Sequence, residues 1–75
     1  MNEPILSEYQ GKPVLNLNPQ GRPSISFGLG KAAVIRENIP AIIAFLLAEG
    51  KSIEVDGEIA QEIGLALEMI EHKLR

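Results

Sequence analysis

The stretch SISFGLGKAAVIRENIPAIIAFLLAEG, residues 24–50, decides the fold of this chain. From residue 24 to residue 29 polar and apolar side chains alternate, which is typical of a β-strand. After Gly28-Leu29-Gly30 the apolar residues recur at the 3.6-residue spacing of an α-helix. The change of period predicts a strand, a turn at the glycines and then a helix.

Pro40 interrupts the sequence of this helix without changing the phase of its apolar positions. Those positions are Ala32, Ile35, Ile39, Ile42, Ile43, Leu46 and Leu47. A proline inside a helix costs about 3 kcal/mol and removes a hydrogen bond. We therefore expect either a kink, or a break after Asn38 that places Pro40 in a new first turn. The preserved phase favours one bent helix.

Residues 42–47 are apolar on nearly every side of the expected helix. Such a helix cannot keep one face in water, so one side can pack on the sheet and the other needs a second partner. The sequence predicts a homodimer or a complex with another protein. The predicted interface residues are Ile42, Ile43, Phe45, Leu46, Leu47, Leu65 and Met69.

Two short strands are predicted before this stretch, at residues 4–9 and 13–18, with a tight hairpin turn at Gln10-Gly11-Lys12. Pro13 should stand at the strand entrance, because it cannot donate a ladder hydrogen bond. Asn18-Pro19-Gln20-Gly21 has the residues of a type I turn. The predicted result is an antiparallel three-stranded meander. Its covered face should carry Leu15, Leu17, Ile25 and Phe27.

After the stretch, Gly50 is a natural helix C-cap and residues 52–55 alternate as in a brief fourth strand. Asp56 is a good N-cap for a second helix that runs to the end of the chain. Its apolar face should carry Ile59, Ile63, Ala66, Leu67, Ile70 and Leu74, with Leu65 and Met69 widening that stripe. The predicted class is α+β, a three- or four-stranded antiparallel meander followed by a kinked helix and a C-terminal helix packed on one face.

The chain of 75 residues is expected to form a single domain, residues 1–75, with an aliphatic core and a small margin of stability. It has no cysteine, so oligomerisation is the remaining means of support. Asn2-Glu3-Pro4 does not begin a secretory signal, and the longest apolar run is about a third of a membrane span. We expect a soluble cytoplasmic protein.

Charge is unevenly distributed along the chain. Residues 1–36 carry +2 and residues 37–75 carry −5, which gives the net charge of −3. A mildly basic strand half could bind single-stranded nucleic acid, although domains of that kind usually have a stronger basic surplus. The residues for this alternative, which include a weak anion site at the glycine turn, are Lys12, Arg22, Gly30, Lys31 and Arg36. Tyr9 offers one ring for base stacking, since Phe27 is expected in the core.

The residues 28–33, GLGKAA, satisfy the loose dinucleotide pattern G-x-G-x-x-G/A. A dinucleotide fold needs several parallel strands, and about 40 residues are too few to supply them. The stretch is not a phosphate loop either, because Ile25 and Ala32 occupy the places of the first glycine and of the Ser or Thr. The favoured interpretation is that the glycines turn the chain and let strand and helix approach.

No combination of residues predicts catalysis, a metal site or a cofactor. His72 stands alone in the last helical turn, without a cysteine or a second histidine to share a metal. Glu58, Glu62, Glu68 and Glu71 lie on the wet face of a helix, where nothing would raise a carboxyl pKa. We expect a protein without enzyme activity.

The order of Phe27-Gly28, Lys31-Ala32, Ile35, Ile39, Ile42 and Phe45 resembles a pattern in short bacterial proteins of unassigned function. It covers about the middle third of the chain and implies no activity. The succession of strands and helix resembles the PC4-type coactivator domain, which implies a dimeric single-strand binder. That family has a more basic sheet and no acidic second helix to match residues 56–75.

Overall fold

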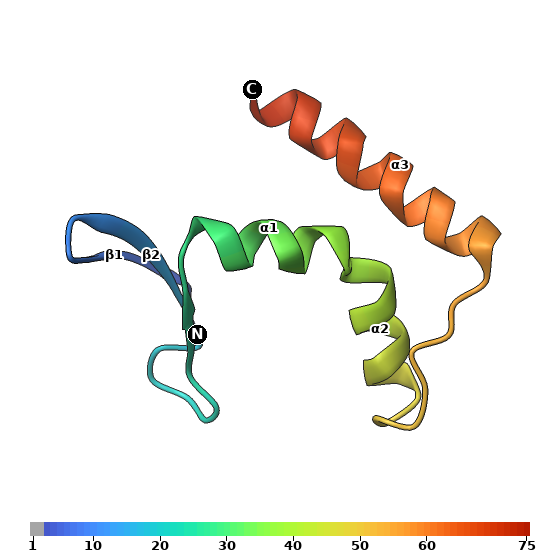
Figure 1. Cartoon of the computed structure of the whole chain (residues 1–75), viewed down its shortest axis with the longest axis horizontal. Coiled ribbons are helices and arrows are strands. Elements are labelled where there is room, and N and C mark those ends of the chain that lie inside the picture. The colour runs from blue at the N-terminus through green and yellow to red at the C-terminus, as the bar shows by residue number, and fades with distance from the viewer. Residues whose placement is uncertain (1–2) are drawn as a thin grey trace. The chain divides into compact units, whose positions relative to one another are not determined.

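The computed structural model describes residues 3–75 and confirms the predicted α+β class. Three strands are followed by three helices (Figure 1). The elements are β1 (Ile5–Tyr9), β2 (Lys12–Leu17), β3 (Ile25–Phe27), α1 (Leu29–Glu37), α2 (Ile39–Leu47) and α3 (Gly57–Leu74). The chain divides into a strand unit that ends at Glu37 and a helical unit from Asn38 to Arg75.

The strands form an antiparallel sheet in the order β1-β2-β3, as the sequence predicts. Tyr9 pairs with Lys12, so the hairpin turn contains only Gln10 and Gly11. Both turn residues have positive φ, +52° and +77°, which is the type I′ geometry that matches the twist of a hairpin. Gly11 adopts this conformation without cost, because it has no Cβ.

Pro13 is the second residue of β2, not the first, and lies opposite Glu8. In a two-residue hairpin the pair next to the turn exchanges both hydrogen bonds, so the next pair along, Glu8 and Pro13, exchanges none. The missing N–H of Pro13 therefore faces the other neighbour, β3. That strand ends at Phe27, the partner of Leu15, so the proline removes no bond from either ladder.

The turn at residues 18–21 is confirmed by a hydrogen bond from the Gly21 N–H to the Asn18 carbonyl oxygen, 3.0 Å. The Asn18 side chain extends this turn, because its Nδ2 donates to the carbonyl oxygen of Pro23 at 2.9 Å. These bonds fix the start of β3 locally. β3 is shorter than the predicted residues 24–29 at both ends.

The two faces of the sheet differ as the alternation predicts. The register places Leu15 with Phe27 and Leu17 with Ile25 on one face. The other face carries a row of hydrogen-bonded polar side chains. Asn16 Nδ2 donates to Ser7 Oγ at 3.2 Å, and Ser26 Oγ donates to Asn16 Oδ1, so the row crosses all three strands.

Helix α1 begins directly after the sheet and contacts β3. The Gly28 carbonyl oxygen accepts the first helical bond from the Ala32 N–H, 3.0 Å. Gly28 does not have a positive φ, and a Cβ built on it would lie 3.6 Å from the Pro13 carbonyl oxygen, an ordinary contact. The glycine at this turn is therefore not required by backbone conformation.

The helical stretch is broken at Asn38, which resolves the choice that Pro40 leaves open. Helix α2 begins at Ile39 with Pro40 in its first turn, where the N–H that proline lacks would have no helical acceptor in any residue. The Asn38 carbonyl oxygen accepts from the Ile42 N–H at 2.9 Å. The preference for one bent helix is thus replaced by two helices of nine residues each.

Residues 52–55 do not form a strand. The Glu54 N–H donates to Ser52 Oγ at 3.0 Å, a local turn that competes with strand pairing. Asp56 caps α3 as predicted, since its Oδ1 accepts from the Glu58 N–H at 2.8 Å. The helix then runs without interruption to Leu74.

Within residues 3–75 no side chain is fully buried. Phe27, which we expected in a core, is half-buried, and Ile25 on the same face is exposed. Because a residue that is exposed in the whole chain is also exposed in its own unit, neither unit encloses a core by itself. The predicted covered face of the sheet is therefore apolar but is not enclosed within the strand unit.

Candidate interaction surface

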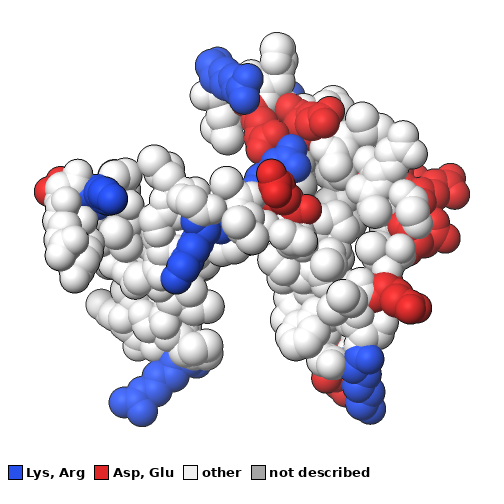
Figure 2. Space-filling view, viewed as in Figure 1, with Lys and Arg blue, Asp and Glu red and all other residues white. Residues whose placement is uncertain are grey.

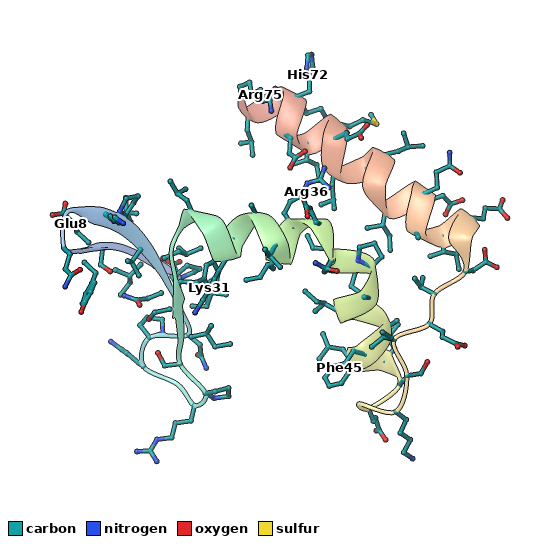
Figure 3. All side chains as sticks on the ribbon, in the orientation of Figure 1. Glu8, Lys31, Arg36, Phe45, His72 and Arg75 are labelled. Atoms are coloured by element: carbon teal, nitrogen blue, oxygen red, sulfur yellow. The ribbon has the colours of Figure 1, made fainter. Side chains whose placement is uncertain are left out.

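Helix α2 provides the most apolar surface of the helical unit. Its sequence, IPAIIAFLL, has no polar side chain. The exposed fraction is 68% for Leu46 and 82% for Leu47, and Ile42, Ile43 and Phe45 are also exposed. All five predicted interface residues on this helix therefore reach solvent in the single chain, and the side chain of Phe45 stands out from α2 in Figure 3.

The C-terminal end of α2 is closed by two backbone hydrogen bonds. The Gly50 N–H donates to the Phe45 carbonyl oxygen at 2.8 Å, and the Glu49 N–H donates to that of Leu46 at 3.1 Å. This is the Schellman arrangement. Gly50 helps to end the helix, as predicted, but the first left-handed residue is Glu49, with φ +54° before the +84° of Gly50.

The Phe45 ring lies against this closing turn. A Cβ on Gly50 would stand 3.6 Å from the Phe45 Cζ, so the ring covers the glycine. A contact between the residue after the turn and the last helical turn commonly accompanies the Schellman arrangement. Here the contact with Gly50 fixes the position of one edge of the exposed Phe45 ring.

A groove of about 410 Å³ separates parts of α2 and α3 within the helical unit. Ile43 and Leu47 line it from α2, and Ile59 and Ile63 line it from α3. The predicted stripe of α3 thus faces α2 at its N-terminal end. Helix α2 is too short to cover the rest of that stripe, and Ile70 and Leu74 stay exposed.

Leu65 and Met69 do not widen this stripe but form a separate apolar patch. They line a different groove, of about 440 Å³, together with Glu68, His72 and Lys73. Residues two apart on a helix point in nearly opposite directions, so Leu65 faces away from Ile63. The seven predicted interface residues therefore lie on two surfaces, five on α2 and two on the far side of α3.

The strand unit has an apolar groove of its own that the sequence does not reveal. The groove, about 350 Å³, is lined by the hairpin end and the start of α1. Tyr9 and Lys12 contribute from the hairpin, and residues 28–30 contribute from the turn. Lys12 and Gly30, two residues of the nucleic-acid alternative, therefore line the same groove as Tyr9.

The other basic residues of that alternative are spread over the strand unit. Arg22 lies between β2 and β3, whereas Lys31 and Arg36 lie on α1. On the face in Figure 2 the Lys and Arg side chains of this unit stand apart from one another, so no continuous basic patch is visible there. Most Asp and Glu residues belong to the helical unit.

The described part of the chain contains no group of side chains suited to holding a metal ion, since no three His, Asp or Glu side chains are grouped in that way among residues 3–75. His72 and Arg75 lie at the C-terminal end of α3 (Figure 3), and Glu58, Glu62 and Glu68 are exposed. No helix within the described residues combines the length and the apolar content that crossing a membrane requires.

The outer edge of β1 is a feature that the sequence analysis missed. β1 is the first strand of the sheet order, so only one of its edges is paired. All five of its residues are exposed. The available signal was that Ile5, Leu6 and Tyr9 place apolar side chains on both faces of one strand.

The chain matches no protein-family model, no curated protein and no solved structure at the level taken as significant.

Proposed function

We propose that this protein is a non-enzymatic interaction module that self-associates through its helical unit. The surface used is the exposed apolar side of α2 together with the Leu65–Met69 patch. The observation that carries the proposal is the absence of any buried side chain among residues 3–75, next to a helix that has no polar side chain.

The accessible area supports a second copy as the partner. The chain exposes 6551 Å². A compact protein of 8.2 kDa exposes about 4,500 Å², and two separate compact bodies of half that mass expose about 5,500 Å² together. Even against the larger figure the surplus is about 1,000 Å², close to the roughly 800 Å² that each partner contributes to a stable interface.

The test is the mass in solution, measured by light scattering over a dilution series, for the wild type and for Leu46→Asp. In a single copy this leucine is 68% exposed, so an aspartate there should change the unfolding free energy by no more than about 0.5 kcal/mol. In an interface the buried carboxylate costs several kcal/mol and should dissociate the assembly. Lys51→Asp, on an exposed position of the same unit, is the control and should leave the mass unchanged.

A single-copy mass for the wild type at every concentration would contradict self-association. A wild type that forms no oligomer alone but elutes with a different purified protein, and loses it on Leu46→Asp, would replace the second copy with that protein as partner.

A second candidate function is weak binding of single-stranded nucleic acid by the strand unit. The observation in its favour is the groove that both Tyr9 and Lys12 line, which offers an aromatic and a basic residue side by side. Binding should weaken as salt increases and should be lost in Arg22→Glu with Lys31→Glu. Absence of binding to an oligonucleotide at low salt would remove this candidate.

A further inference from the structure

The open edge of β1 carries backbone groups that no described strand pairs. In the hairpin the pair Tyr9 and Lys12 lies next to the two-residue turn and exchanges both hydrogen bonds. Alternation along the ladder then turns the N–H and C=O of Ser7 toward β2. Those of Leu6 and Glu8 point to the outer edge.

Edges of natural sheets are usually protected against pairing by charged side chains, especially lysine, or by proline, a bulge or a covering segment. Between Ile5 and Tyr9, β1 has no lysine, no proline and no bulge, and Glu8 is its one charged side chain. Leu6 is 78% exposed, and the whole strand lies open to solvent. The edge is therefore available to another strand.

We propose that β1 pairs with β1 of a second copy in an antiparallel register centred on Ser7. This inference deepens the proposed self-association and rests on it. Leu6 then lies opposite Glu8 of the second copy, and the two residues exchange both backbone hydrogen bonds. The two-fold axis repeats this pair, so every outward N–H and C=O of Leu6 and Glu8 is satisfied.

The sequence of β1 favours this register over the other antiparallel registers in which β1 could pair with β1 of a second copy. Pairing centred on Glu8 would place two carboxylates directly opposite each other, which is destabilising. Pairing centred on Leu6 would bring Pro4, which has no N–H, opposite Glu8 and lose a bond. Only the register centred on Ser7 pairs all five residues of β1, and it sets Ile5 against the Tyr9 ring of the second copy.

The paired sheet has six strands in the order β3-β2-β1-β1-β2-β3. The two-fold axis of such a pair is perpendicular to the sheet, so both apolar faces lie on the same side. The face of Leu15, Leu17, Ile25 and Phe27 is thereby doubled in width. Sheet pairing thus extends an apolar layer that one chain leaves open.

Single cysteines test the register, because the chain has no cysteine of its own. Across the axis the two Ser7 residues form a pair without hydrogen bonds, with Cα atoms about 4.5 Å apart, near the lower limit for a disulfide. Under mild oxidation Ser7→Cys should form a covalent dimer at least about tenfold faster than Lys51→Cys, because pairing raises the local thiol concentration.

Two further variants keep the test decisive if Ser7→Cys does not fold. Tyr9 residues of the two copies should stand about 13 Å apart, so Tyr9→Cys alone should not crosslink, and the same holds for Ile5→Cys. Mixed together, these two variants should crosslink to each other. Glu8→Pro, which removes only an outward N–H, should abolish crosslinking of Ser7→Cys with an unchanged circular dichroism spectrum.

The result that overturns the pairing is crosslinking of Ser7→Cys, or of the mixed pair, no faster than that of Lys51→Cys while the wild-type mass remains oligomeric. In that case self-association through the helices stands without the sheet edge. A single-copy wild type without crosslinking would overturn both proposals.

Discussion

Glu49 holds a left-handed backbone conformation that its side chain disfavours. Its φ is +54°, at the position where helices most often end in glycine. A Cβ in this conformation approaches the following carbonyl oxygen and costs roughly 1 kcal/mol. This free-energy cost is offset by the two hydrogen bonds that the Glu49 and Gly50 N–H groups donate to the last turn of α2.

Glu49→Gly should therefore stabilise the protein by up to about 1 kcal/mol, measured by urea unfolding at one fixed protein concentration. The neighbouring Ala48→Gly is the control. Ala48 has φ −88°, so glycine there gains no conformational relief and should destabilise by about 0.5–1 kcal/mol. Equal effects of the two substitutions would contradict the assignment of the strained residue.

The structure predicts that Gly28 tolerates a larger side chain, whereas its place in the sequence suggests that it does not. A glycine between a strand and a helix suggests positive φ and intolerance of larger side chains. Here φ is ordinary and a Cβ meets only the Pro13 carbonyl oxygen at 3.6 Å. Gly28→Ala should be neutral or stabilising by about 0.5 kcal/mol, because the unfolded chain loses freedom.

Gly11→Ala is the matched control, since Gly11 has φ +77° with open space around it. It should destabilise by roughly 1 kcal/mol from backbone strain alone. Thermal unfolding of both variants checks the pair. A melting temperature that falls more for Gly28→Ala than for Gly11→Ala would mean that the turn before α1 is conformationally restricted.

At the scale of elements, α3 is stabilised at its N-terminus by a single side-chain cap, that of Asp56. Asp56 Oδ1 accepts the Glu58 N–H at 2.8 Å and satisfies one of the free N–H groups of the first turn. Asp56→Ala should destabilise by about 1 kcal/mol, whereas Asp56→Asn, which keeps an acceptor, should retain most of the stability. Urea midpoints measure both, and an equal loss would point to charge instead of the cap.

Most elements were predictable because their signals are local. Alternation located the three strands, turn residues located both turns of the meander, and Asp56 located the start of α3. Residues 52–55 have the same alternation, but Ser52 Oγ accepts a hydrogen bond from the Glu54 N–H and no described strand pairs with these residues. The alternation of side chains alone does not say whether a pairing partner exists.

The candidate site was predictable in composition but not in arrangement. All seven predicted interface residues are exposed and apolar. Their separation into an α2 surface and a Leu65–Met69 patch depends on where α2 ends, at Leu47, and on which side of α3 faces it. The predicted meander already makes β1 an edge strand, but the pattern of one strand does not say whether another segment covers that edge, and the structure leaves all five residues of β1 exposed.

At the scale of the whole molecule, the proposed self-association would couple folding to association, because it covers apolar side chains that the single chain exposes. Neither unit has a buried side chain within residues 3–75, so under the proposed self-association the native state would gain its missing burial from a second copy. When unfolding also separates the copies, mass action makes the melting temperature depend on protein concentration. A chain that folds alone has no such dependence.

The melting temperature should therefore rise by about 5 °C for each tenfold increase in concentration, as expected for a pair of 75-residue chains with an unfolding enthalpy near 0.7 kcal/mol per residue. Leu46→Asp should lower the melting temperature and remove its dependence on concentration, whereas Lys51→Asp should keep both. A wild-type melting temperature that is constant over a hundredfold dilution would mean that each copy encloses enough apolar surface by itself.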